Sequence, residues 1–135
     1  KTSLEKYGRF IFGESYSAMK AGPVPSNAYD LIKSARETKE FGFAVKDDKI
    51  VPLRKAKLDR LSESDIECLN QIVALYGNVP NWKRIEDSHD AAYHAAWDSR
   101  GDKKSVPMQL EQIIDLFDDA DDLKEYVFNR DAEAA

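Results

Sequence analysis

The side chains best suited to chemistry in this sequence are acidic and imidazole groups spaced by four residues. One row would lie along one side of a single continuous helix, and it consists of Glu86, Asp90, His94 and Asp98. An aspartate and a histidine with this spacing can share a metal ion, whereas His89 would point about 140° away from His94. Because a single row without ligands from a second element is usually a solvated face, we predict no metal site. An enzyme that uses this row remains the weaker alternative.

A second candidate for chemistry is the pentapeptide GESYS at residues 13–17, which resembles the turn around a hydrolase nucleophile. That turn needs glycine where Ser17 stands, and no aspartate and histidine follow in suitable places. The six glycines form neither a dinucleotide fingerprint nor a phosphate-binding loop. We therefore predict a polar turn here, a protein that is not an enzyme, no catalytic residues and no cofactor.

Four aspartates near the C-terminus invite comparison with a calcium-binding loop. Such a loop also needs a glycine and a terminal bidentate glutamate, and this segment lacks both. Carboxylates at the start of a last helix would stabilise the helix dipole, which explains their position. An acidic patch that faces a partner protein is the other explanation, and both stay open for Asp118, Asp119, Asp121 and Asp122.

The charge balance argues against nucleic acid as a partner. The chain has 20 basic and 25 acidic residues and a formal net charge of −5, whereas a nucleic-acid-binding domain normally presents a basic face. A helix–turn–helix could be drawn around Gly77, but three nearby carboxylates offset Lys83 and Arg84 in its second helix. We keep a DNA-binding autoregulator only as an alternative, and the charge is compatible with a basic protein partner.

A chain of 135 residues fits one domain, which we place at residues 1–130 with a frayed tail at 131–135. No apolar run approaches 18 residues, so we expect no membrane-spanning helix and no membrane partner. The N-terminus shows neither an initiator methionine nor a signal-peptide pattern, and we expect residues to precede Lys1. Cys68 is the sole cysteine, so we predict a cytoplasmic protein in which this thiol is buried as a small apolar group.

Apolar periodicity predicts a compact, mainly helical fold of the mixed α+β class. The clearest helix begins after Ser62, where Asp65 completes a near capping box, and Gly77 suits the C′ position at its end. Its apolar face should contain Ile66, Leu69, Ile72, Val73 and Tyr76. Other helices are expected at residues 2–7, 24–35 (started by Pro25 or capped by Ser26), 80–87, 88–100 with Ser88 as cap, 108–117 and, for a short one, 123–127.

One small β-hairpin is predicted at residues 41–53, where aromatic and β-branched residues alternate with small ones and two aspartates supply a turn. Pro52 should make the second strand an edge. The segment 9–22 is too often interrupted by glycine and serine for a long helix, so we expect it to be extended or irregular. We interpret GPVP at residues 22–25 as a rigid bend that holds the next helix against the core.

Aromatic and charged side chains are the candidates for contact with a partner. Four aromatic side chains could anchor an interface, because aromatic residues dominate binding hot spots: Trp82, Trp97, Tyr93 and Tyr29. A place in the core explains any single one of them more simply. Lys20 flanks the GPVP block and could touch the same partner. The full set of predicted partner-binding residues is Lys20, Tyr29, Trp82, His89, Trp97, Asp118, Asp119, Asp121 and Asp122.

Three sequence blocks occur in a recognisable order. They are YGRFIFGESYSAMKAGPVPSNAYDLIK at residues 7–33, KIVPLRKAKLDRLSESDIECLNQIVALYGN at 49–78 and NWKRIEDSHDAAYHAAW at 81–97. Together they resemble the Panacea domain, the SocA-like antitoxin family, with the GPVP block and its following tyrosine as the most specific part. The family domain usually begins with an apolar helix, which this chain shows only as residues 1–7.

The resemblance implies an antitoxin without catalytic activity. Such a protein would bind a toxin encoded beside it and block it by direct contact, within a toxin–antitoxin system of the kind used in phage defence. An adaptor that delivers the bound toxin to a protease is the alternative that the resemblance implies. The family is paired with many unrelated toxins, so the resemblance does not identify the toxin.

Overall fold

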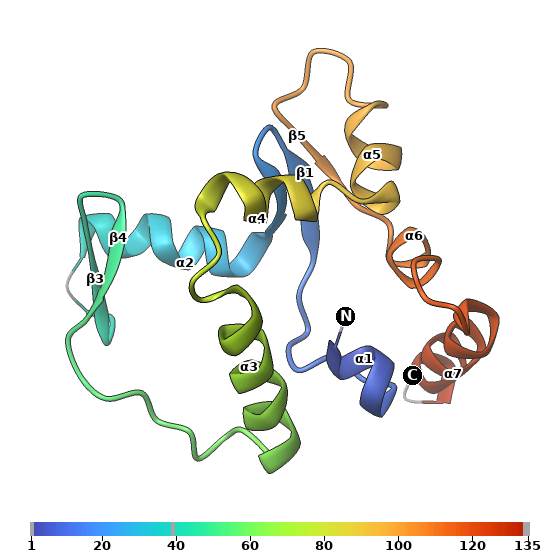
Figure 1. Cartoon of the computed structure of the whole chain (residues 1–135), viewed down its shortest axis with the longest axis horizontal. Helices are drawn as coiled ribbons and strands as arrows, with labels where there is room; N and C mark the ends of the chain where they lie inside the picture. The colour runs from blue at the N-terminus through green and yellow to red at the C-terminus, as the bar shows by residue number, and fades with distance from the viewer. Residues whose placement is uncertain (1, 39, 134–135) are drawn as a thin grey trace.

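The computed structural model describes residues 2–38 and 40–133, with side chains as far as residue 129. The mainly helical, mixed α+β class predicted from the sequence is confirmed (Figure 1). In the described part of the chain the elements follow in the order α1 (Thr2–Tyr7), β1 (Tyr16–Met19), β2 (Gly22–Pro25), α2 (Ser26–Glu37), β3 (Phe43–Lys46), β4 (Lys49–Pro52), α3 (Glu63–Tyr76), α4 (Asn81–Ser88), α5 (Ala91–Trp97), β5 (Ser105–Pro107), α6 (Leu110–Ile114) and α7 (Ala120–Glu133).

The strands form two small antiparallel sheets, whereas the sequence predicts one hairpin. β3 and β4 are the predicted hairpin. The other sheet has three strands in the order β2-β1-β5. Its last strand, β5, lies between the helices predicted at residues 88–100 and 108–117, where the sequence predicts no element. Because β1 pairs with a strand from far along the chain, local sequence patterns could not reveal this sheet.

The GPVP block is strand β2 and not the rigid bend that the sequence suggests. It pairs antiparallel with β1, and just beyond it the Ser26 amide donates to the Ser15 carbonyl at 2.9 Å. Hydrogen-bonded positions alternate along an antiparallel ladder, so Pro23 and Pro25 fall at positions whose amides would point away from β1. The two prolines therefore remove no hydrogen bond between β2 and β1. They also leave the outer edge of the sheet with fewer amide donors.

The first turn of α2 is capped by a side chain from outside the helix. Pro25 is the N-cap residue, and it has no capping side chain, while Ser26 is already helical. The carboxylate of Glu14 accepts hydrogen bonds from the amides of Asn27 at 2.9 Å and Ala28 at 3.3 Å. Glu14 thereby satisfies amides that have no partner within the helix, and it ties the segment before β1 to α2.

The predicted hairpin of β3 and β4 turns through its two aspartates. Asp47 and Asp48 have φ angles of 49° and 58°, as a two-residue turn that follows the twist of its strands requires. The Arg36 guanidinium of α2 donates to Asp48 Oδ1 at 2.8 Å. β4 pairs with β3 in a sheet of two strands, with Pro52 opposite Phe43, so the predicted edge position of this strand is confirmed.

The start of α3 confirms the predicted capping box. The Ser62 hydroxyl accepts a hydrogen bond from the Asp65 amide at 3.2 Å, and the Asp65 carboxylate accepts one from the Ser62 amide at 2.9 Å. The end of the helix differs from the prediction. Gly77 has a right-handed φ of −57° instead of the left-handed conformation of a C′ glycine. The backbone therefore turns toward α4 without a positive φ at this glycine.

The helices predicted at residues 80–87 and 88–100 are α4 and α5, and the second begins after Asp90. The Asp90 carboxylate accepts a hydrogen bond from the Tyr93 amide at 3.0 Å and caps α5. The prediction that Ser88 caps this helix is wrong, because Ser88 is the last residue of α4 and its hydroxyl donates to the Ile85 carbonyl at 2.8 Å. Aspartate and serine are both good caps, so the sequence alone left this choice of residue ambiguous.

The last two helices differ from their predicted lengths. α6 is shorter than the predicted range 108–117, because residues 108–109 lead in from β5 and residues 115–117 form a turn. α7 is longer than a short helix at 123–127. It extends to Glu133, three residues into the predicted frayed tail, and residues 134–135 lie outside the described part of the chain.

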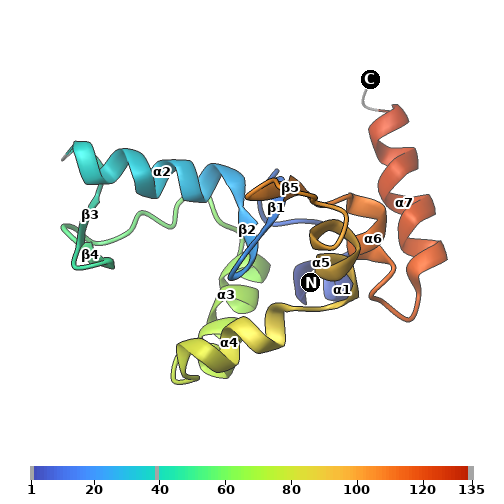
Figure 2. The same ribbon diagram turned by 90° about the horizontal axis from the view of Figure 1, so that it is seen from above.

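Two small clusters of buried side chains hold the described elements together. Their buried members are Leu4, Ile114 and Leu123 in the first, and Ala18, Tyr93 and Ala96 in the second. The chain exposes 10175 Å², whereas a compact monomer of 15.3 kDa exposes about 7,100 Å². The fold is thus more open than the sequence suggests, with α2 and the β3–β4 hairpin reaching to one side and α7 to the other (Figure 2).

Candidate protein-interaction surfaces

The row of Glu86, Asp90, His94 and Asp98 is divided between two helices. Glu86 belongs to α4, whereas Asp90 is the cap of α5, so the break between the helices removes the common face that a row would need. On α5, His94 Nδ1 and Asp98 Oδ2 lie 3.8 Å apart and both side chains are exposed. No three imidazole, thiol or carboxylate groups among the described residues are placed to hold a metal ion.

Three of the predicted partner-binding residues are exposed on separate elements. Trp82 in the first turn of α4 is 67% exposed. Tyr29 on α2 is 41% exposed, and the Lys33 ammonium lies 5.5 Å from its ring centroid. Lys20 is exposed in the turn between β1 and β2. Each side chain is accessible to a partner, and their role in binding stays a prediction.

Two other predicted residues, His89 and Trp97, pack against the buried ring of Tyr93. The ring centroid of Tyr93 lies 4.3 Å from that of His89 and 6.0 Å from that of Trp97. The Arg100 guanidinium covers the Trp97 ring at 4.1 Å from its centroid. The Tyr93 hydroxyl donates to the Met19 carbonyl at 3.0 Å, which joins this stack to β1. For these two residues the packing fits a place in the core. Tyr93 itself is 1% exposed, so the suggestion that it anchors an interface is wrong.

The four aspartates surround the start of α7 and are all exposed. Asp118 and Asp119 form the turn before the helix, and Asp121 and Asp122 lie in its first turn, where they oppose the positive end of the dipole. Both views of the fold place α7 well away from α4 (Figures 1 and 2). The structure therefore does not gather Trp82 and these carboxylates into one patch.

An uncovered apolar surface lies along α3. Four side chains that the periodicity places on one helix face are between 37% and 68% exposed: Leu69, Ile72, Val73 and Tyr76. Most of them line a cavity of about 620 Å³ between α1, α3 and the start of α2. Phe10, Phe12 and Tyr16 continue the lining into a second cavity of about 410 Å³ beside α6. Sequence analysis missed this surface, because periodicity shows an apolar face but not whether another element covers it.

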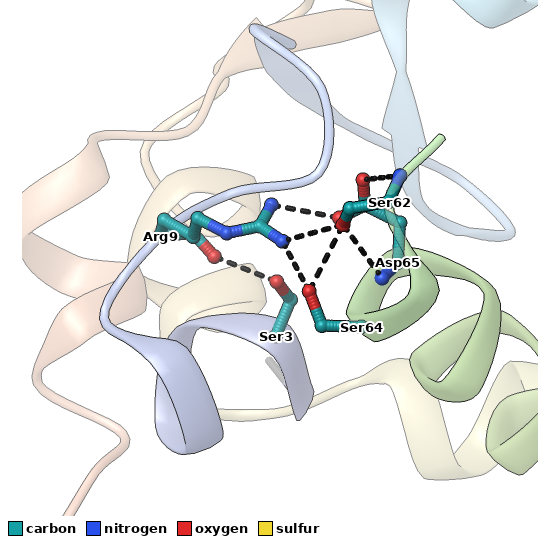
Figure 3. A network of polar contacts seen from close by, with 5 residues as sticks. All are labelled: Ser3, Arg9, Ser62, Ser64 and Asp65. Carbon is teal, nitrogen blue, oxygen red and sulfur yellow. Dashed lines mark hydrogen bonds and ion pairs between the residues drawn. The ribbon is translucent and has the colours of Figure 1, made fainter. Parts of the chain in front are cut away.

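A polar network ties the segment after α1 to the start of α3 (Figure 3). The Arg9 guanidinium donates to Asp65 Oδ1 at 2.7 Å and to Ser64 Oγ at 2.7 Å. It also donates to Ser62 Oγ at 3.1 Å, and the Ser3 hydroxyl donates to the Arg9 carbonyl at 2.8 Å. The hydrogen bond from the Ser62 amide, followed by the bond from Arg9, holds the pKa of the Asp65 carboxyl below its usual range.

Asp65→Asn is expected to lower the melting temperature at pH 7 and to have no such effect in acid. The pKa of Asp65 is lower in the folded chain than in the unfolded one, so its charge stabilises the fold above about pH 4. That stabilisation is lost as the pH falls through the folded-state pKa. Circular dichroism melts from pH 7 to pH 2 should show the two melting curves converging.

The matched control for this experiment is Glu63→Gln, which removes an exposed carboxylate from the same helical turn. Its melting temperature should follow that of the wild type closely across the range, because a surface charge contributes little. A difference between wild type and Asp65→Asn that stayed constant from pH 7 to pH 2 would contradict the role assigned to the charge.

No helix in the described residues is both long enough and apolar enough to cross a membrane. The family model described as antitoxin SocA-like, Panacea domain matches residues 1–98, a range that contains α1 to α5, the GPVP strand and the Arg9 network. No curated protein and no solved structure matches the chain. The family description points to a non-catalytic role. The chain belongs to the SocA-like antitoxin family of Panacea domains.

Proposed function

We propose that this protein is an antitoxin that neutralises a cognate toxin by direct binding and catalyses no reaction itself. Membership of the antitoxin family supports the first part. The observation that supports direct binding is the exposed area, which exceeds that of a compact chain of this mass by about 3,000 Å². A stable protein complex buries about 800 Å² on each partner, so the chain has ample surface for one.

Neutralisation would follow from occlusion of the toxin's active or target-binding face. By mass action, the toxin stays inactive while the concentration of free antitoxin exceeds the dissociation constant of the complex. Trp82 and the Asp118–Asp122 cluster are among the predicted contacts. Because they lie on separate elements, a toxin that used both would have to extend around the chain. The Cys68 thiol is buried and unpaired, as the sequence predicts, which fits the cytoplasmic location that we propose.

Co-expression with the product of the adjacent reading frame tests this function. The wild-type chain should rescue growth from that product and co-purify with it. Trp82→Ala and, separately, Asp121→Lys/Asp122→Lys should weaken rescue, because each change removes a predicted contact. Neither change removes a buried group, so the chain should still fold. Toxicity that persists with soluble wild-type chain present would refute the antitoxin function.

Two further experiments separate the alternatives. Rescue that disappears in a host without its cytoplasmic proteases, while binding persists, would identify a protease adaptor. A gel shift with operator DNA at physiological salt, without co-purification of the toxin, would identify a DNA-binding autoregulator.

A further inference from the structure

Residues 46–60 of this acidic protein have a higher density of cationic side chains than the rest of the chain. This segment, here called the basic arm, contains β4, the turn before it and the extended chain that leads to α3. It contains six basic and three acidic residues, a net charge of +3. Since the whole chain has a net charge of −5, the other 120 residues carry −8. The six cations are Lys46, Lys49, Arg54, Lys55, Lys57 and Arg60.

The basic arm is exposed and packs little against the rest of the chain. Val51 is its only half-buried residue, and the others are exposed. None of the six cations forms an ion pair with a described residue, and Asp48 alone among the arm's charged groups does so, with Arg36. After β4 the arm forms no helix or strand before α3, and Figure 1 shows it at the periphery of the molecule.

Three apolar side chains are interspersed with these cations. Ile50 and Leu53 are each 54% exposed and Leu58 is 49% exposed. Exposed lysine and arginine next to exposed aliphatic groups suit a protein surface that has carboxylates around an apolar centre. An extended segment that orders on such a surface can contact many groups at once, although it loses conformational entropy on binding.

Nucleic acid fits the basic arm less well than an acidic protein does. Asp47 and Asp48 form the tip of the hairpin, where they would repel phosphate groups. Residues 46–60 include no aromatic side chain on which a base could stack. The three exposed aliphatic groups would gain nothing from a phosphate backbone, whereas a protein partner could bury them.

We propose that the basic arm, residues 46–60, is a toxin-contacting surface and that it binds an acidic, partly apolar face of the toxin. This inference rests on the antitoxin function proposed above and adds the chemistry of the partner. Opposite charge would speed the encounter of the two proteins, and Ile50, Leu53 and Leu58 would then be buried between them. The predicted contact through Asp118–Asp122 requires a basic face, so a toxin that used both surfaces would present faces of opposite charge to them.

Charge reversal with a matched control tests the basic arm. The probe is the product of the adjacent reading frame, after wild-type chain has been shown to rescue growth from it. Lys55→Glu/Lys57→Glu should raise the dissociation constant about tenfold or more and weaken its dependence on salt. Lys103→Glu/Lys104→Glu makes the same charge change at exposed lysines in the loop before β5, and it should change the constant by less than about twofold. Leu58→Ser should weaken binding without altering the salt dependence.

The outcomes distinguish failure of the basic arm as a contact surface from failure of the antitoxin function. Equal effects of the two double variants, or full rescue by Lys55→Glu/Lys57→Glu, would overturn the basic arm as contact surface and leave the antitoxin function standing. Loss of binding to duplex DNA or RNA in a gel shift, with toxin affinity unchanged, would assign the arm to nucleic acid and overturn the proposal. Failure of the wild-type chain to rescue growth would remove both proposals together.

Discussion

Gly22→Ala is expected to destabilise the fold by about 2–4 kcal/mol, from backbone strain and a steric clash together. Gly22 has a φ of +124°, a conformation that side chains with a Cβ rarely adopt. A Cβ at this position would also lie 2.6 Å from Ser88 Oγ at the end of α4. The Ser88 hydroxyl donates to the Ile85 carbonyl, so moving it away would cost that hydrogen bond. Urea unfolding followed by circular dichroism measures the change.

Two other glycines separate the strain from the clash. Gly101 has a φ of +58° but no atom within 4 Å of its added Cβ, so Gly101→Ala should show strain alone, about 1–2 kcal/mol. Gly13 has neither a positive φ nor a near neighbour, so Gly13→Ala should change stability by less than about 0.5 kcal/mol. Ser88→Ala introduced with Gly22→Ala should restore part of the loss. If all three glycine variants were equally stable, the close packing of the β1–β2 turn on α4 would be wrong.

The parts of the fold that sequence analysis predicted depend on residues close together in the chain. The Ser62–Asp65 capping box and the turn at Asp47–Asp48 need only their own neighbours, and both are present. The GPVP strand was missed because prolines are poor strand formers unless they fall at the non-hydrogen-bonded positions of an edge. That register depends on β1 and on the pairing across Ser15 and Ser26, which no local pattern shows.

To predict the interaction surfaces, one must know which individual side chains are exposed, and a residue's type indicates only its average exposure. Trp82 and Trp97 look equivalent as residues, yet Trp82 is exposed whereas Trp97 is stacked between Tyr93 and Arg100. The apolar periodicity of α3 is usually a sign of a covered face. Here the face stays open because no described element crosses it. The charge of the basic arm can be counted in the sequence, but only the structure shows that its cations are exposed and available to a partner.

Ile114→Ala is expected to cost about 2–5 kcal/mol, because it would leave a cavity where three helices meet. Ile114 is fully buried, with Leu4 of α1 and Leu123 of α7 as the other buried members of its cluster. With small domains stable by only about 5–15 kcal/mol, this loss is a large share of the total. It should also release the two ends of the chain, so hydrogen exchange should accelerate in α1 and α7 more than in α5.

Leu75→Ala is the matched control for this substitution, because it also truncates an aliphatic side chain within a helix. Leu75 is 58% exposed on α3, so its truncation leaves no enclosed cavity and should change stability by less than about 0.5 kcal/mol. Thermal and urea unfolding of both variants provide the comparison. The small terminal core would be the wrong description if the two variants lost similar stability. It would also be wrong if exchange in α1 stayed unchanged while the molecule as a whole lost stability, because Leu4 of α1 is buried in the same cluster as Ile114.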